Sequence, residues 1–402
     1  MRNASNYAHT IVQNNIYRIG GLTQIFTVWT LLAEARDGIW NDPVTKYLSD
    51  LSPSSEGAST KQSSLHYIYW EDVTVGWLAS HMAGLPRDYC IGDLSEEASN
   101  VHEGLPPSMD CYPGSTSINQ TQDGYIIEKP TGQSFTEILE TRILDPLSLS
   151  QTSLNTPLNT YFVVLPSNPK NSGWTTQFSG EAPNPPFPLR QSNPELNAPH
   201  QVPNKPLEPS SHTSNPANSI GYPWIIYSSG NYPSTSMVDI YTYYSSVGQY
   251  SSYIGLVPNY NVGFTVLAAD SVSAPDLNAH ADIIGDGILS ASMKIAVMQV
   301  GANFNGLSTA SVVDSFITVK VDRLPGMFVE GFVSNRADLR ETLGTLIGVE
   351  DPDALSIRLY PTGLIQKTED GGSKVAFRAV YPDKNELADS GDIYLCVVVG
   401  CG

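Results

Sequence analysis

The segment Ile19-Gly20-Gly21-Leu22-Thr23-Gln24 opens a periodic apolar run, and it limits the chemistry that this chain can carry. A hydroxyl and an amine at positions i and i+3 of a starting helix form a nucleophile with its own base, because both side chains share one helix face. At that spacing the segment offers Gly21 and Gln24. Glycine has no nucleophile, and a neutral carboxamide is no base at ordinary pH. This helix start therefore supplies no nucleophile with its own base.

A Ser-x-x-Lys sequence does occur elsewhere, at residues 167–170. Its third residue, Pro169, falls inside the turn that would have to be helical, and proline breaks a helix interior. We attribute this match to chance and expect no nucleophile there.

Helices and strands are expected on both sides of the Gly21 segment. Apolar residues recur along 22–37 at the spacing of one helix face, which predicts a core helix. Similar runs predict further helices over 73–84, 134–144 and 279–300. Stretches rich in β-branched and aromatic residues are typical of antiparallel strands, and they cover 237–244, 251–257 and 263–269. The chain is therefore expected to be an α+β protein.

The length of 402 residues exceeds the usual size of one domain, so two domains are expected. Residues 166–223 are crowded with Pro, Asn and Ser, which predicts a long surface excursion. After residue 300 the pattern changes to short strands with one helix around 336–346. We expect a first domain over 1–300, with a helical subdomain at about 42–165, and a small, mainly β C-terminal domain over 301–402.

The composition argues against several classes of partner. The formal net charge is −19, from 40 acidic and 21 basic residues, and the basic residues form no cluster. Nucleic acid and anionic membrane are therefore not expected as partners. The four cysteines, Cys90, Cys111, Cys396 and Cys401, lack the spacing of a zinc site. Neither a metal nor another cofactor is expected.

Residues 1–15 contain no continuous apolar stretch. Neither a signal peptide nor a membrane span is predicted there. The location stays open between a cytoplasmic protein and a secreted one whose leader was removed, and the oligomeric state is equally open.

Five stretches of the chain resemble one family of proteins. They are residues 17–20 with the helix that follows, 40–47, 73–88, 131–147 and 250–258. On these motifs the chain is identified as a member of the β-lactamase-related family, the class C β-lactamase and penicillin-binding-protein-like serine hydrolases, which include a branch frequent in fungi. The resemblance implies a β-lactamase/transpeptidase-like fold, in which helices and a helical subdomain flank an antiparallel sheet.

The resemblance also implies that the catalytic motifs of the family are lost. Its Ser and Lys fall on Gly21 and Gln24. Its Tyr-x-Asn element falls on Ser115-Thr116-Ser117 or, after a two-residue shift, on Ser117-Ile118-Asn119, and both placements stay open. Its Lys-Thr-Gly element falls on Tyr243-Tyr244-Ser245, so a phenol replaces the cation. Because residues alternate faces along a strand, Tyr243 and Ser245 are expected to point into the pocket and Tyr244 away.

The family's oxyanion hole consists of backbone N–H groups, which the resemblance places at Gly21 and about Ser246. The positive end of the following helix adds to their effect, so a carbonyl or enolate oxygen is expected to be polarised there. A substrate held at this point is expected to contact Gln24, Ser115, Ser117, Asn119 and Ser245.

Three functions fit this pattern. The first is a repurposed enzyme that isomerises, cyclises or dehydrates a small natural-product-like molecule, with Tyr243 as acid or base; the family's association with natural-product pathways supports it. The second is a catalytically inactive protein that binds a ligand or partner, in which Tyr243 only packs. The third is acyl transfer from a substituted nucleophile, Thr23 or Ser245, although Thr23 lies about 200° around the helix from Gly21. His81 is expected to be structural.

Overall fold

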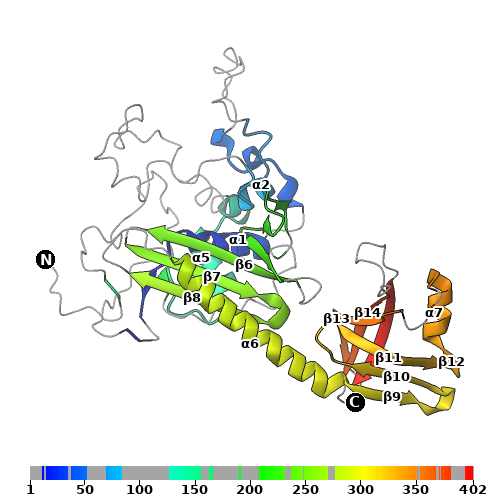
Figure 1. Ribbon diagram of the computed structural model, residues 1–402. Helices are drawn as coiled ribbons and strands as arrows, with labels where there is room; N and C mark the ends of the chain where they lie inside the picture. Colours follow the sequence, from blue (N-terminus) through cyan, green and yellow to red (C-terminus); the bar gives the residue numbers. More distant parts are fainter. Residues whose placement is uncertain are drawn as a thin grey trace. The chain divides into compact units, whose positions relative to one another are not determined.

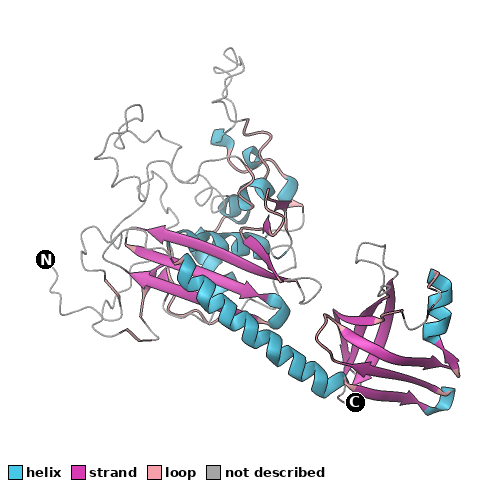
Figure 2. Cartoon of the chain, viewed as in Figure 1, coloured by secondary structure: helices cyan, strands magenta, loops and turns pink. Residues whose placement is uncertain are grey.

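The chain forms two compact units in a computed structural model (Figures 1 and 2). The first unit comprises residues 1–228 and 239–286, and the second comprises residues 229–238 and 287–402. The structure describes residues 11–12, 15–34, 38–51, 69–83, 126–154, 163–165, 190–191, 207, 209–230, 237–247, 249–269, 277–349, 351, 354–367, 371, 373–381 and 394–401.

The first unit is built around α1 (Thr23–Glu34), which follows a 3-10 turn, η2 (Gly20–Leu22). This confirms the predicted core helix. Burial extends beyond the predicted apolar face because threonine hydroxyls on the polar side bond to the helix itself. Thr27 Oγ1 donates to the Thr23 carbonyl over 3.0 Å, and Thr30 Oγ1 donates to the Phe26 carbonyl over 2.7 Å. A helix enclosed in this way holds its first turn in a fixed place.

Short helical segments pack beside α1. They are η3 (Ile39–Asn41), η4 (Val44–Lys46), η5 (Ser49–Leu51), α2 (Val75–Ala79), α5 (Phe135–Leu139) and the π-helical turn η7 (Glu140–Leu144). The predicted helix over 134–144 is confirmed, and it begins with a capping box between Ser134 and Glu137. The predicted helix over 73–84 is shorter than expected. It stops at Ala79, and His81 then takes a left-handed backbone conformation with φ 59°.

A six-stranded sheet, in the order β3-β4-β5-β6-β7-β8, packs one face against α1. Its strands are β3 (Ser211–His212), β4 (Asn218–Ile220), β5 (Ile225–Ser229), β6 (Val238–Val247), β7 (Tyr250–Val257) and β8 (Val262–Ala269). The three predicted strands correspond to β6, β7 and β8. The pair β3 and β4 lies inside the predicted excursion over 166–223, and both strands are short and near the sheet edge, where Pro-rich flanks are tolerated. A separate pair joins β1 (Tyr17–Arg18) to β2 (Arg190–Gln191).

The long helix α6 (Asn278–Phe304) matches the predicted helix over 279–300 and extends it. Its first turns belong to the first unit, where Leu277 and Ala281 pack against Tyr253 of β7. Among the described residues it is the one helix long and apolar enough to cross a membrane, by length and composition only, over Ala279–Phe304. A core helix of a soluble protein that meets the same criterion is mostly buried, whereas only 6% of this apolar window is buried. The absence of a membrane partner stays a prediction.

The second unit contains a seven-stranded sheet in the order β15-β14-β13-β11-β10-β9, with β12 paired to β11. Figure 1 labels most of these strands. Its elements are β9 (Gly306–Ala310), η10 (Ser311–Val313), β10 (Ser315–Lys320), β11 (Met327–Ser334), β12 (Ala337–Asp338), α7 (Leu339–Ile347), β13 (Arg358–Lys367), β14 (Ser373–Val380) and β15 (Tyr394–Cys401). This confirms a mainly β C-terminal domain with one helix near 336–346. The chain passes from the first unit to the second inside α6, between residues 286 and 287. The predicted domain boundary near residue 300 stays a prediction.

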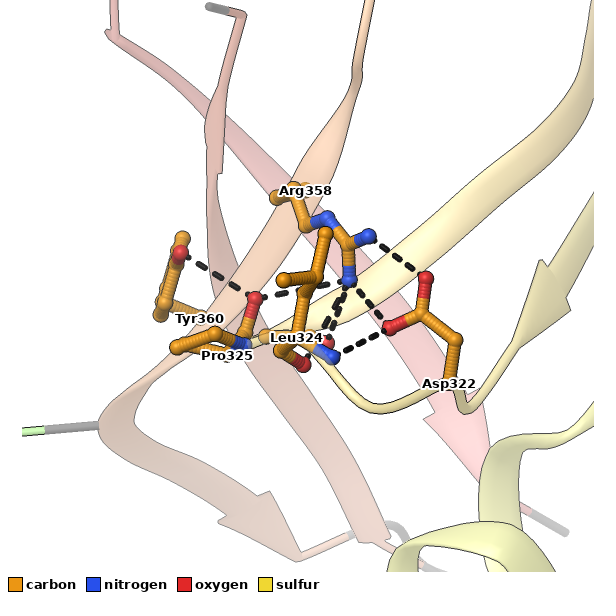
Figure 3. Close-up of polar contacts among 6 residues, drawn as sticks. Asp322, Leu324, Pro325, Arg358 and Tyr360 are labelled. Carbon is orange, nitrogen blue, oxygen red and sulfur yellow. Dashed lines mark hydrogen bonds and ion pairs between the residues drawn. The ribbon is translucent and has the colours of Figure 1, made fainter. Parts of the chain in front are cut away.

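A buried arginine fastens one loop of this second unit (Figure 3). Arg358 is 6% exposed, and its guanidinium donates to both carboxylate oxygens of Asp322, over 2.7 and 2.5 Å. The same group reaches the carbonyl oxygens of Leu324, Pro325 and Gly326, at 3.3 to 3.5 Å. Tyr360 Oη also donates to the Pro325 carbonyl over 3.2 Å, so two side chains of β13 hold the loop between β10 and β11.

Candidate functional site

The turn that leads into α1 is tied to the sheet at several points. Ser252 Oγ of β7 donates to the Ile19 carbonyl over 2.8 Å, and Thr23 Oγ1 donates to the Gly20 carbonyl over 2.7 Å. Gly20 takes φ 54°, a conformation that side-chain-bearing residues rarely adopt. The turn therefore has a fixed position against β6 and β7.

The hydroxyl of Ser245 occupies the backbone donor of Gly21. The Gly21 N–H donates to Ser245 Oγ, and Ser245 is only 2% exposed. A Cβ added to Gly20 would lie 2.8 Å from that Oγ and 3.2 Å from the Ser246 carbonyl oxygen, so the helix start and β6 are in close contact here. The sequence predicted an N–H at Gly21 open to a substrate oxygen and a Ser245 that contacts substrate. The structure instead joins these two groups to each other.

The hydrogen bond between Gly21 and Ser245 depends on the sizes of these two residues. Gly21 leaves its N–H uncovered, and a serine on β6 is long enough to reach it. The N–H of a half-buried residue gains a partner in this way. A ligand oxygen can use this donor only after it displaces Ser245 Oγ.

Tyr243 and His81 meet beside this turn. Tyr243 packs on the α1 face of β6, whereas Tyr244 packs against Tyr253 on the other face. Tyr243 Oη lies 3.5 Å from His81 Nε2, and the two rings stack with centroids 6.0 Å apart and planes 28° apart. His81 is exposed and Tyr243 is half-buried. Tyr243 stands two residues from Ser245 on the same strand face, about 7 Å along the strand.

Gln24 lies one turn beyond Gly21 on α1. It is half-buried, and its Oε1 is buried without a hydrogen-bond partner. Thr23 is 1% exposed, and its hydroxyl is used within the turn. A polar atom of Gln24 is therefore the unsatisfied acceptor of this site, whereas Thr23 has no free access to a substrate.

The remaining predicted site residues, Ser115, Ser117 and Asn119, lie outside the described residues, as do Cys90 and Cys111. Within the described ranges, no group of three or more His, Cys, Asp or Glu side chains could hold a metal ion. The role of the predicted Tyr-x-Asn position stays a prediction.

Sequence reasoning missed the contact of His81. Residues 81 and 243 are 162 positions apart, and no local periodicity can show that they meet. The prediction that His81 is only structural does not account for its place beside Tyr243.

The described site and sheet define a class of protein. A core helix starts against the central strands of an antiparallel sheet, with short helices packed beside it, and this arrangement is the β-lactamase/transpeptidase-like fold. The family model described as "Beta-lactamase" matches residues 6–183, and the model described as "Beta-lactamase-like-like, C-terminal domain" matches residues 296–400. The chain is therefore a β-lactamase-like protein that carries both a β-lactamase family domain and this C-terminal domain.

Two relatives are similar in sequence. A "Beta-lactamase-like protein" of Arthroderma benhamiae is 25% identical over 416 residues, which cover 87% of this chain and 66% of the relative. A "Beta-lactamase" of Escherichia coli is 28% identical over 172 residues, which cover 41% of this chain and 39% of the relative. The chain thus spans less than two thirds of the length of either relative.

Two solved structures are also similar in part. The octameric penicillin-binding protein homologue from Pyrococcus abyssi has 18% identity and a TM-score of 0.47, covering 95% of this chain and 84% of that chain. The β-lactamase/D-alanine carboxypeptidase from Yersinia pestis, complexed with citrate, has 16% identity and a TM-score of 0.44, covering 66% of this chain and 82% of that chain.

Proposed function

We propose that this β-lactamase-like protein performs non-hydrolytic proton-transfer chemistry on a small natural-product-like molecule, in the class of isomerisation, cyclisation or dehydration. The observation that carries the proposal is the contact between Tyr243 Oη and His81 Nε2 at 3.5 Å. A phenol and an imidazole are both groups that exchange protons with a substrate, and such contacts often tighten when substrate binds.

In the proposed mechanism, Tyr243 donates or accepts the proton at the substrate, and His81 relays it. His81 is exposed, so protons can pass between the pair and solvent. Imidazole suits this role because its charge changes near physiological pH. Gln24 Oε1, the buried acceptor on the first turn of α1, supplies a hydrogen-bond acceptor for a hydroxyl or N–H of the substrate.

The proton-transfer proposal also includes the kind of partner expected from the sequence. The partner we propose for the site between α1 and β6 is a small organic molecule. The net charge of −19 disfavours nucleic acid, and no cofactor is required for proton transfer.

A second candidate function is ligand binding without turnover. It is favoured by the hydrogen bond from Gly21 N–H to Ser245 Oγ, which occupies the donor that would otherwise polarise a substrate carbonyl. In this case Tyr243 and His81 form an aromatic wall of the binding site.

The test follows solvent deuterium. The protein is incubated in D₂O with a panel of carbonyl-containing natural products, and mass spectrometry measures deuterium uptake and product formation. We expect uptake with at least one compound, and a loss of about 10²- to 10⁴-fold in Tyr243→Phe, the contribution usual for a general acid or base. Tyr244→Phe, on the other face of β6, is the matched control and should keep the wild-type rate.

Two outcomes contradict the proposal. Compounds that bind tightly without exchange or product would support the binding function instead. Equal rates in wild type and Tyr243→Phe would remove Tyr243 from the chemistry.

A further inference from the structure

The helix α6 presents apolar side chains on its exposed side. It runs without a break over Asn278–Phe304 (Figure 1), and little of its apolar window is buried. Ile283 is 74% exposed and Val297 is 53% exposed. Apolar side chains that gather on an exposed surface mark sites of interaction with other molecules. The exposed side of α6 is therefore expected to bind a partner.

The exposed side of α6 has a symmetric sequence about Ser290. Positions 4, 7 and 11 residues before and after Ser290 lie within about 40° of it around the helix, so they share one face. The residues at these distances are Asp286 and Lys294, then Ile283 and Val297, then Ala279 and Gly301. Gly301 is partly exposed, and the others, with Ser290, are exposed. We call these seven residues the α6 face.

The charges of the α6 face are complementary to those of a second copy. When two copies of a helix pair antiparallel about a twofold axis at Ser290, each residue meets the residue at the same distance on the opposite side of Ser290. Lys294 of each copy then meets Asp286 of the other. A parallel pair would bring Lys294 to Lys294 and Asp286 to Asp286, and like charges in contact oppose association. The antiparallel pair is therefore the favoured one.

Lys294 and Asp286 are available for these contacts. Among the described residues, neither forms an ion pair, and both side chains are exposed. At the next positions, Ile283 of each copy would meet Val297 of the other, so two apolar contacts flank the two ion pairs. Charged pairs set the register and orientation of paired helices, whereas burial of the apolar side chains drives the association.

Two glycines of α6 are consistent with a close approach by another helix. Glycine in a helix interior lowers stability relative to alanine. Neither Gly287 nor Gly301 has a positive φ, and a Cβ added at either position would meet no atom within 4 Å. Nothing in the described structure therefore requires glycine at these positions. The space beside them can accommodate a second helix.

A lipid bilayer fits the α6 face less well. Lys294 lies near the middle of Ala279–Phe304, and a charge in the hydrocarbon core is costly. The end of the helix also packs on folded protein, because the Phe304 ring meets the Phe377 ring of β14 edge-on, with centroids 5.1 Å apart. A second copy gives Lys294 an acidic partner, whereas the hydrocarbon core does not.

We propose that the α6 face binds the α6 face of a second copy of this chain, as an antiparallel helix pair centred on Ser290. Two ion pairs between Lys294 and Asp286 fix the orientation, and Ile283 packs against Val297 on each side of them. The proposal is independent of the function proposed above, which uses no residue of α6.

The oligomeric state of the full chain tests this pairing. Sedimentation velocity over a concentration series should show a monomer–dimer equilibrium. Lys294→Glu places acidic side chains opposite each other and should weaken the dimer about tenfold or more, because it changes two charge pairs at once. The double variant Asp286→Lys with Lys294→Glu exchanges the charges and should restore wild-type affinity. Lys374→Glu, the same charge change at an exposed position of β14, is the matched control and should have no effect.

Cross-linking tests the orientation of the two helices. In the antiparallel pair the two copies of residue 290 meet, whereas the two copies of residue 279 lie about 33 Å apart along the helix axis. Ser290→Cys should therefore form a disulfide-linked dimer under mild oxidation, and Ala279→Cys should not. Both variants keep the same native cysteines, so the difference between them reports the new contact.

Four results contradict the proposal. A monomer at every concentration would overturn it, and flotation of that monomer with phosphatidylcholine vesicles would show that lipid covers the α6 face instead. A dimer that Lys294→Glu leaves unchanged would place the interface elsewhere. Equal cross-linking of Ser290→Cys and Ala279→Cys would indicate a parallel pair.

Discussion

We expect incubation with a fluorophosphonate to leave the intact mass of this protein unchanged. The reagent labels an activated serine, and neither part of the activation is present: Gly21 has no hydroxyl and Gln24 has no basic nitrogen. In a serine hydrolase, loss of the nucleophile or its base lowers kcat by about 10⁶-fold. We therefore expect neither labelling nor hydrolysis of a β-lactam above the uncatalysed background.

The two hydroxyls nearest to the helix start do not replace the missing nucleophile. Thr23 Oγ1 donates to the Gly20 carbonyl and Ser245 Oγ accepts from the Gly21 N–H, and both residues are almost fully buried. Neither has a basic partner in these bonds. A stoichiometric adduct on Thr23 or Ser245 would contradict this account and favour the acyl-transfer function.

The positive control is the variant that combines Gly21→Ser, Gln24→Lys and Ser245→Gly. It returns the hydroxyl and the amine to one helix face and vacates the Gly21 donor. The positive φ of this turn belongs to Gly20, so a side chain at position 21 meets no backbone penalty of that kind. We expect this variant to become labelled at position 21, whereas Gly21→Ser alone should stay unlabelled because it lacks the base.

We expect the variant Arg358→Ala to lower the free energy of unfolding of the second unit by about 2–3 kcal/mol. The substitution removes the hydrogen bonds to Asp322 and to three loop carbonyls (Figure 3). It also removes the guanidinium that lies 5.5 Å from the Phe328 ring centroid. Asp322 is 40% exposed, which keeps the cost below that of a fully buried pair. Hydrogen exchange of β10, β11 and β13 measures the change within the full chain.

The control is Arg336→Ala, which breaks an ion pair with Asp314 in the same unit. Both of its side chains are more than half exposed, so we expect a change within about 0.5 kcal/mol. Equal exchange in the two variants would show that the buried pair has no special role.

The pH dependence of stability provides a second test of the ion pair between Arg358 and Asp322. The hydrogen bond from Arg358 lowers the pKa of Asp322 in the folded state, so the pair stabilises fully above the unfolded pKa of about 4. That stability is lost as the pH falls through the folded pKa. Arg358→Ala should therefore flatten the acid limb of the stability curve.

Much of the fold could be predicted because its signals are local. The period of α1, the β-branched content of β6 to β8 and the capping box at Ser134 are each contained in about a dozen residues. The end of α2 could not be predicted, because it depends on the left-handed conformation of His81. The burial of α1 on its polar side could not be predicted either, since it requires threonine hydroxyls to bond within the helix.

The site was predictable only in part. The resemblance brought Gly21, Gln24 and Tyr243 to one place, and strand alternation put Tyr243 and Tyr244 on opposite faces. The pairing of Ser245 with Gly21 and of Tyr243 with His81 depends on contacts across 224 and 162 residues. Such contacts are decided by packing, and no pattern within either segment encodes them.

The bond between Gly21 and Ser245 has a consequence for combining substitutions at this site. Ser245 Oγ fills the donor at the helix start, and the space beside Gly20 is already occupied by the same atom. A serine placed at position 21 without a base gains no activation, and a change at Ser245 alone removes the partner of the Gly21 N–H. The effects of substitutions at positions 21, 24 and 245 are therefore expected to be epistatic, because residues that share a partner do not act additively.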